Sequence, residues 1–283
     1  PPTSYPRPWG VAGCGAMGLP MARRLWAAGF PVRGLDIRPA GEFADFAPQM
    51  EEDPTVFART VEGVISVVRD ASQTEVLCFG PRGLFNAPPY PRLLVVSSTL
   101  SPRFLPHLRR RLPEDVALVD APMSGAPMGA VDGNLTFMVG GSAAAVAAVQ
   151  PALAAMGRHI HHLGPLGAGM TVKVLNNFVA ATSVVAVRRT LARAKALGID
   201  PEVLRQVMAQ SSGATWFGDH FATISWAREG YACDNTMAIL EKDVNAALDA
   251  LGELPVSGAR DGAVDAFEGA LLQALRQLEP WGE

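Results

Sequence analysis

The chain has 283 residues and a formal net charge of −3, so it is long enough for two domains and lacks the strong basic excess of a nucleic-acid-binding protein. Hydrophobic residues make up 49% and charged residues 18% of the sequence, which excludes global disorder. No uncharged apolar run reaches the roughly 18 residues that a membrane span needs, so we expect neither a nucleic acid nor a membrane as a partner.

Candidate strands and helices alternate through the first half of the chain. Short apolar runs predict strands at 9–13, 32–36, 63–68, 93–97 and 116–120, and helical patterns lie between them at 17–28, 53–60, 71–79 and 102–112. This alternation is typical of a parallel, doubly wound α/β sheet. Residues 135–139, 143–156 and 159–163 predict one further βαβ or hairpin-like extension, and we expect the Gly- and Pro-rich loop 121–133 to be irregular.

The pattern changes after Gly169, where strand signals end. Residues 170–198 form one long helical pattern whose first half is apolar almost all round, so we expect it to be buried on most sides. Further helices are predicted at 201–210, 236–251 and 263–278. We place the boundary in the loop 164–169 and predict an α/β first domain, residues 1–166, and an all-helical second domain, residues 167–283, joined by the long helix.

A Gly-x-Gly-x-x-Gly motif spans 13–18, directly after the first predicted strand and at the start of a helix. In that context Gly13 permits a tight turn, Gly15 lets the backbone approach a pyrophosphate, and Gly18 allows close helix–strand packing. The next strand ends at Asp36, whose carboxylate would bond the adenosine ribose hydroxyls and repel a 2′-phosphate. We therefore expect a NAD(P)-binding, Rossmann-like domain that prefers NAD over NADP, although Arg38 could accept a 2′-phosphate. The alternative is a glycine turn that only packs.

Lysine is scarce in this chain. All but three of the 24 basic residues are arginine, and the exceptions are Lys173, Lys195 and Lys242. A bias toward arginine would replace a surface lysine at little cost, but it would not replace a lysine whose amine must release a proton, because arginine stays charged. Each remaining lysine is therefore a candidate functional residue.

Cysteine and histidine indicate neither a disulfide framework nor a metal site. The three cysteines are few, odd in number and far apart: Cys14, Cys78 and Cys233. Residues 1–9 hold no apolar signal-peptide core, so we expect reduced thiols and a cytoplasmic location. The spacing of His159, His161 and His162 suits neither a helix face nor a Cys/His zinc pattern, and we expect no metal.

Five motifs occur in order along the chain: GCGAMGLPMA at 13–22, VVSSTLSP at 95–102, DAPMSGAPMGAVDGNLTFMVGG at 120–141, GPLGAGMTVKVLNN at 164–177, and EKD at 241–243. Together they resemble the β-hydroxyacid dehydrogenases, the family that contains 3-hydroxyisobutyrate dehydrogenase and tartronate semialdehyde reductase. The resemblance extends from about residue 9 to about residue 250. It implies a Rossmann-like N-terminal domain, an all-helical C-terminal domain and an active site between them. The implied reaction is reversible NAD(P)-dependent oxidation of a small, carboxylate-bearing hydroxy acid to its aldehyde or keto acid.

The resemblance also implies roles for individual residues. Lys173 would be the catalytic residue, Asn177 would orient the substrate, and Ser124 with Gly125, continued by Ala126, would hold the substrate carboxylate. Thr99 would contact the nicotinamide end of the cofactor, and Lys242 would lie beside it. The predicted cofactor-binding residues are Gly13, Gly15, Ala16, Met17, Gly18, Asp36, Val68, Thr99 and Lys242.

These residue types suit the chemistry. Oxidising an alcohol by hydride transfer requires a group that takes the hydroxyl proton and returns it in the reverse reaction. A lysine can do both once burial or a neighbouring charge brings its pKa toward neutrality. Lys173 lies in an otherwise apolar segment, and Asn177, four residues on, shares its helix face. An amine and an amide on one face can hold one hydroxyl from two sides.

Each of these residues also has a purely structural interpretation. Lys173 could extend along the helix surface to solvent, Asn177 could cap or pack, and Lys242 could belong to a solvated face. The segment 124–126 could be an ordinary turn instead of a nest of N–H groups for a carboxylate. Thr99 could cap the helix that follows it.

Three positions depart from the family pattern. Arg69 stands where a proline is common, Ala126 replaces a common second glycine in the substrate loop, and Arg189 falls where an acidic residue is usual. They leave the substrate open among 3-hydroxyisobutyrate, glycerate, 4-hydroxybutyrate and other hydroxy acids. Alternatives on the same fold are an imine reductase, which usually carries Asp or Tyr in place of the lysine, and a non-catalytic dinucleotide-binding protein. We expect a homodimer or homotetramer formed through the helical domain.

Overall fold

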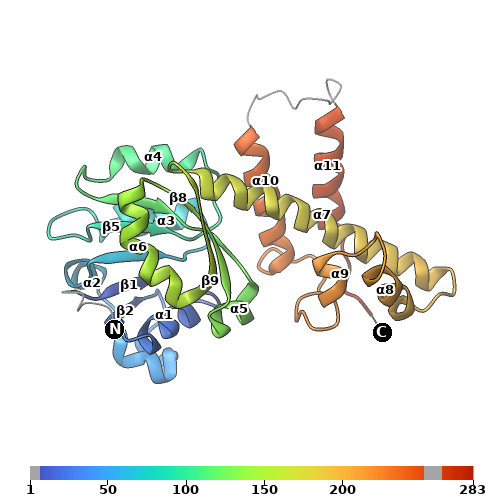
Figure 1. Ribbon diagram of the computed structural model, residues 1–283, viewed down its shortest axis with the longest axis horizontal. Helices are drawn as coiled ribbons and strands as arrows, with labels where there is room; N and C mark the ends of the chain where they lie inside the picture. Colours follow the sequence, from blue (N-terminus) through green and yellow to red (C-terminus); the bar gives the residue numbers. More distant parts are fainter. Residues whose placement is uncertain (1–6, 252–262, 283) are drawn as a thin grey trace. The chain divides into compact units, whose positions relative to one another are not determined.

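The computed structural model describes residues 7–251 and 263–282 and divides the chain into two compact units, Pro1–Lys173 and Val174–Glu283. The first unit contains the sheet and the second is helical (Figure 1). The predicted fold class, a Rossmann-like domain followed by a helical region that begins with a long helix, is confirmed. The two units meet inside that long helix, at Lys173 and Val174, whereas the sequence places the boundary in the loop that precedes it.

The elements have the following bounds. The strands are β1 (Trp9–Ala12), β2 (Val32–Leu35), β3 (Met50–Glu51), β4 (Gly63–Ser66), β5 (Leu93–Val96), β6 (Ala117–Asp120), β7 (Met123–Ser124), β8 (Leu135–Gly140) and β9 (Gly157–Gly164). The α-helices are α1 (Gly18–Ala27), α2 (Pro54–Thr60), α3 (Ala71–Phe79), α4 (Phe104–Arg111), α5 (Ala126–Asp132), α6 (Ala143–Met156), α7 (Ala168–Ala196), α8 (Pro201–Ala209), α9 (Trp216–His220), α10 (Thr236–Leu251) and α11 (Ala263–Arg276). A 3₁₀ helix, η1, spans Ala40–Gln49.

The described strands form one sheet in the order β3-β2-β1-β4-β5-β6-β8-β7, with β9 paired to β8. The first six strands in this order, from β3 at the edge to β6, are parallel to one another. Strand β8 runs antiparallel to β6 and β7, and β9 is parallel to β8. In register, Ala12, Ser66 and Val96 follow one another across β1, β4 and β5. The loops after these strands therefore leave the sheet at one edge, which is where ligands of open α/β sheets bind.

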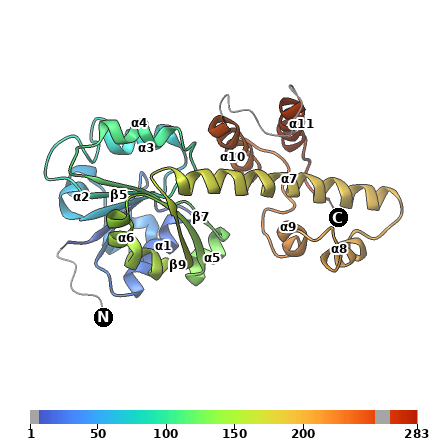
Figure 2. The ribbon, with the colours of Figure 1, turned by 45° about the horizontal axis from the view of Figure 1, so that its top comes forward.

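Two apolar layers cover the two faces of this sheet. On one face, α1 and α6 pack on alternate strand residues such as Val11, Ile65 and Val95. On the other face, α2, α3 and α4 pack on the intervening residues such as Val64 and Leu94. Figure 2 shows α1 and α6 on one side of the strands and α3 and α4 on the other. Burial on both faces explains why the central strands read as continuous apolar runs rather than as alternating ones.

Short polar residues begin several of the helices. Asp53, Asp70 and Asp200 accept hydrogen bonds from backbone N–H groups in the first turns of α2, α3 and α8, and Ser142 and Thr215 do the same for α6 and α9. Each such bond satisfies one of the four N–H groups that a helix start leaves without an intrahelical partner.

The second unit is built around the C-terminal part of α7. Its core contains residues of α7, α9, α10 and α11, among them Val184, Phe217, Val244 and Leu275. The guanidinium of Arg188 is buried and donates to the carbonyl oxygens of Ala227, at 2.7 Å, and Glu229, at 2.8 Å. It thereby ties α7 to the segment between α9 and α10.

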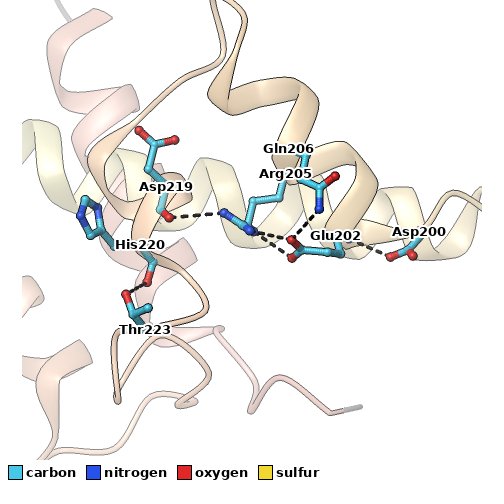
Figure 3. Close-up of polar contacts among 7 residues, drawn as sticks. All are labelled: Asp200, Glu202, Arg205, Gln206, Asp219, His220 and Thr223. Carbon is cyan, nitrogen blue, oxygen red and sulfur yellow. Dashed lines mark hydrogen bonds and ion pairs between the residues drawn. The ribbon is translucent and has the colours of Figure 1, made fainter.

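Helices α8 and α9 are joined by a polar cluster, which Figure 3 shows. The Arg205 guanidinium donates to both carboxylate oxygens of Glu202, at 2.9 and 2.6 Å, and to the Asp219 carbonyl oxygen at 3.3 Å. Gln206 adds a bond to the same Glu202 carboxylate at 3.2 Å. The Arg205 bond to Asp219 makes a helix-to-helix link at the surface of this unit.

The apolar first half of α7 is not buried on most sides, so this expectation from its composition was wrong. Within the chain, Val172, Leu175 and Val179 are 40%, 46% and 67% exposed. Among the described residues, α7 is the one helix long and apolar enough, by length and composition, to cross a membrane, with a window of mean hydropathy 1.4. Core helices of soluble proteins pass the same test, so this property alone carries little weight.

The loop 121–133 is more regular than its Gly and Pro content suggests. It forms the two-residue strand β7, which pairs with β8, and the helix α5. The expectation of an irregular loop was therefore wrong. The structure also contains η1, β3 and α9, which the sequence did not predict. β3 and α9 have too few residues to produce a periodic pattern, and η1 is interrupted by non-helical backbone angles at Phe43 and Ala44.

Candidate functional site

The glycine motif forms the turn between β1 and α1. Gly13 has φ +89°, and a Cβ atom there would lie 2.8 Å from the Val67 carbonyl carbon and 2.9 Å from the Val68 nitrogen. A Cβ atom at Gly18 would lie 1.9 Å from the Gly13 carbonyl oxygen. At Gly15, by contrast, a Cβ atom would meet nothing within 4 Å. The first and third glycines are thus required by packing, and the second leaves its backbone open to a ligand.

The start of α1 is suited to bind an anion. Gly15 and Ala16 are exposed, Met17 occupies the cap position, and within the described residues no side chain caps this helix. The Leu19 N–H donates to the Gly15 carbonyl oxygen at 3.1 Å and Pro20 has no N–H, so the groups that can meet an anion are the backbone N–H groups of the turn itself, at residues 15–18, where the helix dipole also favours negative charge. An open glycine backbone beside an uncapped helix start fits the pyrophosphate of a dinucleotide.

Asp36 follows β2 and is linked to the glycine loop through Arg38. The Arg38 Nε donates to Asp36 Oδ1 at 3.1 Å, and its Nη2 donates to the Cys14 carbonyl oxygen at 2.8 Å. Its guanidinium also lies 4.6 Å from the centre of the Phe43 ring. The Asp36 side chain is only 9% exposed. Asp36 and Arg38, which favour opposite cofactors, thus form one ion pair beside the glycine loop.

Val68 and Thr99 follow the neighbouring strands β4 and β5. The Ser98 hydroxyl donates to the Val68 carbonyl oxygen at 2.6 Å, which joins the two strand ends. Thr99 is half-buried beside this link. Both predicted residues therefore lie at the carboxyl edge of the sheet that also carries the glycine loop, and their contacts with a cofactor stay predictions.

The predicted carboxylate-binding loop is held by β8. Ser124 pairs with Thr136 of β8, Gly125 has φ +134°, and the Gly129 N–H donates to the Gly125 carbonyl oxygen at 2.9 Å. Ala126 has φ +55°, a left-handed conformation that glycine adopts freely and that costs an L-residue about 1–2 kcal/mol. This conformation explains why a glycine is common at the position of Ala126.

Lys173 and Asn177 lie on α7, one turn apart on the same face. Lys173 is 7% exposed, so its amine does not extend into bulk solvent. The Asn177 amide nitrogen donates to Asp243 Oδ2 at 2.5 Å. An amide nitrogen carries two hydrogens, so one N–H of Asn177 remains for a ligand.

Asp243 is a site residue that the sequence reasoning did not select. It is 3% exposed, and besides the Asn177 amide it accepts the Lys242 ammonium at 2.6 Å on Oδ1. It therefore brings two predicted residues, Asn177 and Lys242, to one carboxylate. A signal was present in the sequence, because Asp243 falls in the buried row of α10 with Leu240, Val244 and Ala247, where a carboxylate requires partners.

Two other groups that the sequence singled out have different surroundings. Lys195, the third lysine, is exposed near the end of α7. His162 contacts the carbonyl oxygens of Gly141 and Gly164 at 3.0 and 3.2 Å. Across residues 7–251 and 263–282, no group of three or more His, Cys, Asp or Glu side chains is arranged to hold a metal ion.

Comparison with known proteins places both halves of the chain. A family model described as the NAD binding domain of 6-phosphogluconate dehydrogenase matches residues 9–164. A second, described as the NAD-binding of NADP-dependent 3-hydroxyisobutyrate dehydrogenase, matches residues 167–268.

Similar full-length proteins agree with these models. An L-threonate dehydrogenase of Cupriavidus necator is 35% identical over 211 residues, covering 73% of this chain and 71% of the relative. The mitochondrial 3-hydroxyisobutyrate dehydrogenase of Bos taurus is 30% identical over 251 residues, covering 86% of this chain and 75% of the relative. A solved structure of Mycobacterium tuberculosis 3-hydroxyisobutyrate dehydrogenase with L-serine superposes with a TM-score of 0.74 at 25% identity, covering 97% of this chain and 96% of that one.

Proposed function

The chain belongs to the β-hydroxyacid dehydrogenase family, and we propose on that premise that Lys173 serves as the general acid/base in the interconversion of a small hydroxy acid and its aldehyde or keto acid. The enzyme class, an NAD(P)-dependent dehydrogenase acting on hydroxy acids, follows from the family. The observation that carries the assignment of Lys173 is its burial: a lysine only 7% exposed, on a helix whose next turn presents Asn177 fixed by Asp243. A buried amine with an oriented amide on the same face is suited to a reacting hydroxyl.

In the oxidative direction, the Lys173 amine takes the proton of the substrate hydroxyl, and in the reductive direction it returns that proton. The free N–H of Asn177 donates to the same oxygen and orients it. When bound, NAD(P) supplies the acceptor, or the donor, of the hydrogen and electron pair on the substrate carbon. Asp243 keeps Asn177 oriented and neutralises Lys242 next to it.

The substrate carboxylate would be held by the loop 124–126. The Ser124 hydroxyl and the backbone N–H groups of Gly125 and Ala126 lie in the turn between β7 and α5, where successive N–H groups can bind an anion. 3-Hydroxyisobutyrate, L-threonate and L-serine, the molecules in the names of the similar proteins, share a carboxylate and a hydroxyl a short distance apart. We propose a substrate of this class, with glycerate and 4-hydroxybutyrate as further candidates.

We propose NAD as the preferred cofactor. The Asp36 carboxylate would accept the ribose hydroxyls and repel a 2′-phosphate, and Arg38, the group that could neutralise such a phosphate, is already bonded to Asp36 and to the Cys14 carbonyl oxygen. We expect kcat/KM to be larger with NAD than with NADP. The difference between the two values should become smaller in Asp36→Ala.

The test is NADH absorbance with a panel of 3-hydroxyisobutyrate, L-threonate, L-serine, glycerate and 4-hydroxybutyrate, with a cyclic imine as a control for imine reductase activity. Lys173→Ala and Lys173→Arg should abolish turnover and leave the Kd for NADH unchanged. Lys195→Arg, the matched substitution at the exposed lysine, should leave both unchanged. Turnover that survives in Lys173→Arg would refute the assigned role, and NADH binding without turnover of any substrate would favour a non-catalytic binding protein.

We also propose a homodimer or homotetramer formed through the helical unit. Leu175 and Val179 of α7 and Phe267 of α11 are 46%, 67% and 51% exposed, and a second copy could cover them. Light scattering that finds only a species of about 30 kDa would refute this proposal. We further propose a cytoplasmic location, which the low and odd number of cysteines favours and which localisation of a tagged chain would test.

A further inference from the structure

One buried carboxylate outside the proposed reaction lies at the start of α7. Asp120, the last residue of β6, is 0% exposed. Its Oδ1 accepts the Gly167 N–H at 2.7 Å, and its Oδ2 accepts the Met170 N–H at 2.6 Å. Both donors belong to the turn that begins α7, where N–H groups lack intrahelical partners. A carboxylate is also favoured there by the helix dipole.

This contact is close-packed by glycine. A Cβ atom at Gly140 would lie 2.4 Å from Asp120 Oδ1, and a Cβ atom at Gly169 would lie 2.2 Å from the Met138 carbonyl oxygen. Gly167 has φ +97°. The first turn of α7 therefore rests directly on the backbone of β8 and on the Asp120 carboxylate, and a side chain at Gly140 or Gly169 would collide with this contact.

The same residue stands at the start of the substrate loop. Only three residues separate Asp120 from Ser124, and the Met138 N–H donates to the Pro122 carbonyl oxygen between them at 3.0 Å. On the helix side, Lys173 follows Met170 by three residues, about one turn or 4.5 Å of rise. One side chain thus connects the loop proposed to hold the carboxylate with the helical turn that carries the proposed acid/base.

We propose that Asp120 is a positioning residue for the reaction, which fixes the Lys173 amine relative to Ser124 and Gly125 by clamping the first turn of α7. The inference rests on the proposed role of Lys173. Asp120 touches neither substrate nor cofactor in this scheme and acts only through the backbone N–H groups that it holds. Lysine has four rotatable side-chain bonds, so an unclamped helix start would spread the amine over positions that do not meet the hydroxyl.

The electrostatics agree with a clamp. Burial raises the pKa of the Asp120 carboxyl above its ordinary value, and hydrogen bonds from the backbone N–H groups of Gly167 and Met170 oppose that rise. In Asp120→Asn, one oxygen becomes an NH₂ group that faces a backbone N–H. One hydrogen bond to the α7 turn is then lost, because the NH₂ group and the backbone N–H are both donors, while the side-chain volume hardly changes.

The experiment compares Asp120→Asn with Val119→Ala, which removes buried volume from the preceding residue of β6 and keeps the carboxylate. Asp120→Asn should lower kcat at least tenfold, leave KM and the Kd for NADH within about threefold, and speed amide hydrogen exchange at Gly167 and Met170. Val119→Ala should lower the melting temperature at least as much, with kcat within twofold of wild type and unchanged exchange at those two amides. A wild-type kcat in Asp120→Asn, or the same small loss in both variants, would overturn the proposal.

Hydrogen exchange of the wild-type enzyme tests the clamp without any variant or any activity. The amides of Gly167 and Met170 should exchange much more slowly than the first-turn amide of Glu202, which is bonded to the exposed cap Asp200. Fast exchange at Gly167 and Met170 in wild type overturns the inference even where Asp120→Asn does not fold. Protected amides in an enzyme that oxidises none of the hydroxy acids would instead refute the proposed function and leave the clamp in place.

Discussion

Asp243 gives the sharpest test of the site geometry, because one carboxylate holds two residues of the proposed site. Its oxygens accept the Asn177 amide at 2.5 Å and the Lys242 ammonium at 2.6 Å. A hydrogen bond to a charged group contributes about 1.5–3 kcal/mol. The Lys242 side chain is 28% exposed, and solvent screens its charge. We therefore assign the Lys242–Asp243 ion pair about 1 kcal/mol of the free energy of unfolding. Asp243→Asn keeps one acceptor oxygen, and we expect a loss of about 2–3 kcal/mol in the free energy of unfolding.

The catalytic loss should follow from the Asn177 bond alone. An amide that loses one orienting bond of about 1.5–3 kcal/mol lowers kcat roughly 10- to 100-fold, if that energy is needed to reach the transition state. The assays are urea unfolding at pH 7 and kcat with saturating NAD and the best hydroxy acid. Asp200→Asn, an exposed helix cap where Asn serves nearly as well as Asp, is the matched control and should change neither quantity.

A double-mutant cycle separates orientation from general damage. If Asp243 acts through Asn177, the variant Asn177→Ala combined with Asp243→Asn should lose little more activity than Asn177→Ala alone. Fully additive losses would refute the orienting role. The orienting role would also be refuted if Asp243→Asn kept a kcat within threefold of wild type while Asn177→Ala lost most of its activity.

Three further predictions concern the glycine loop, the substrate loop and the thiols. Gly18→Ala should weaken NADH binding at least tenfold, because its Cβ would lie 1.9 Å from a backbone oxygen, whereas Gly41→Ala, with nothing within 4 Å, should bind as wild type; fluorescence titration measures both. Ala126→Gly removes the strain of φ +55°, which costs about 1–2 kcal/mol, but adds about 0.4–1 kcal/mol of unfolded-state entropy. Urea unfolding should therefore show a net gain in the free energy of unfolding of up to about 1.6 kcal/mol, and a clear loss would contradict this. Burial raises the pKa of the Cys14 and Cys78 thiols from 9.0 to about 12. As pH rises above 9, both thiols therefore stay protonated in the folded state, whereas they ionise in the unfolded state. Their contribution to the free energy of unfolding should be fully present below pH 9 and fall as pH rises from 9 toward 12. The slope of the free energy of unfolding against pH should be smaller in Cys78→Ala than in wild type. Equal slopes in the two proteins would contradict an origin in the buried thiols.

The long helix shows what periodicity can and cannot predict. The sequence predicts 170–198 and the structure has Ala168–Ala196, because a run of good helix formers between glycines leaves few other choices. Its burial was predicted wrongly, since Val172, Leu175 and Val179 are exposed within the chain. Hydrophobicity does not say which side chains of a helix the same chain covers, because apolar side chains also lie on protein surfaces.

The substrate loop was mispredicted for a different reason. Gly and Pro content indicates that a segment cannot follow a regular periodic pattern, and 121–133 follows none over a full turn. The loop is nevertheless ordered into β7 and α5, because β8 pairs with Ser124 and positive φ at Gly125 and Ala126 redirects the chain into a helix. Both causes are contacts or angles that a single sequence does not display. The motif in this loop nonetheless identified the candidate carboxylate site.

Arginine bias links the composition to the chemistry. Guanidinium groups perform the structural tasks of this chain: Arg38 bonds Asp36, Arg188 bonds buried carbonyl oxygens, and Arg205 joins α8 to α9. None of these tasks needs a proton to leave, and a planar fork with five donors performs them better than an ammonium. Lys173 is buried on the apolar segment of α7, where a charged side chain carries a desolvation cost that its partners have to offset. The proposed role of Lys173 agrees with this pattern, because acid/base catalysis needs an amine that can become neutral, whereas arginine stays charged.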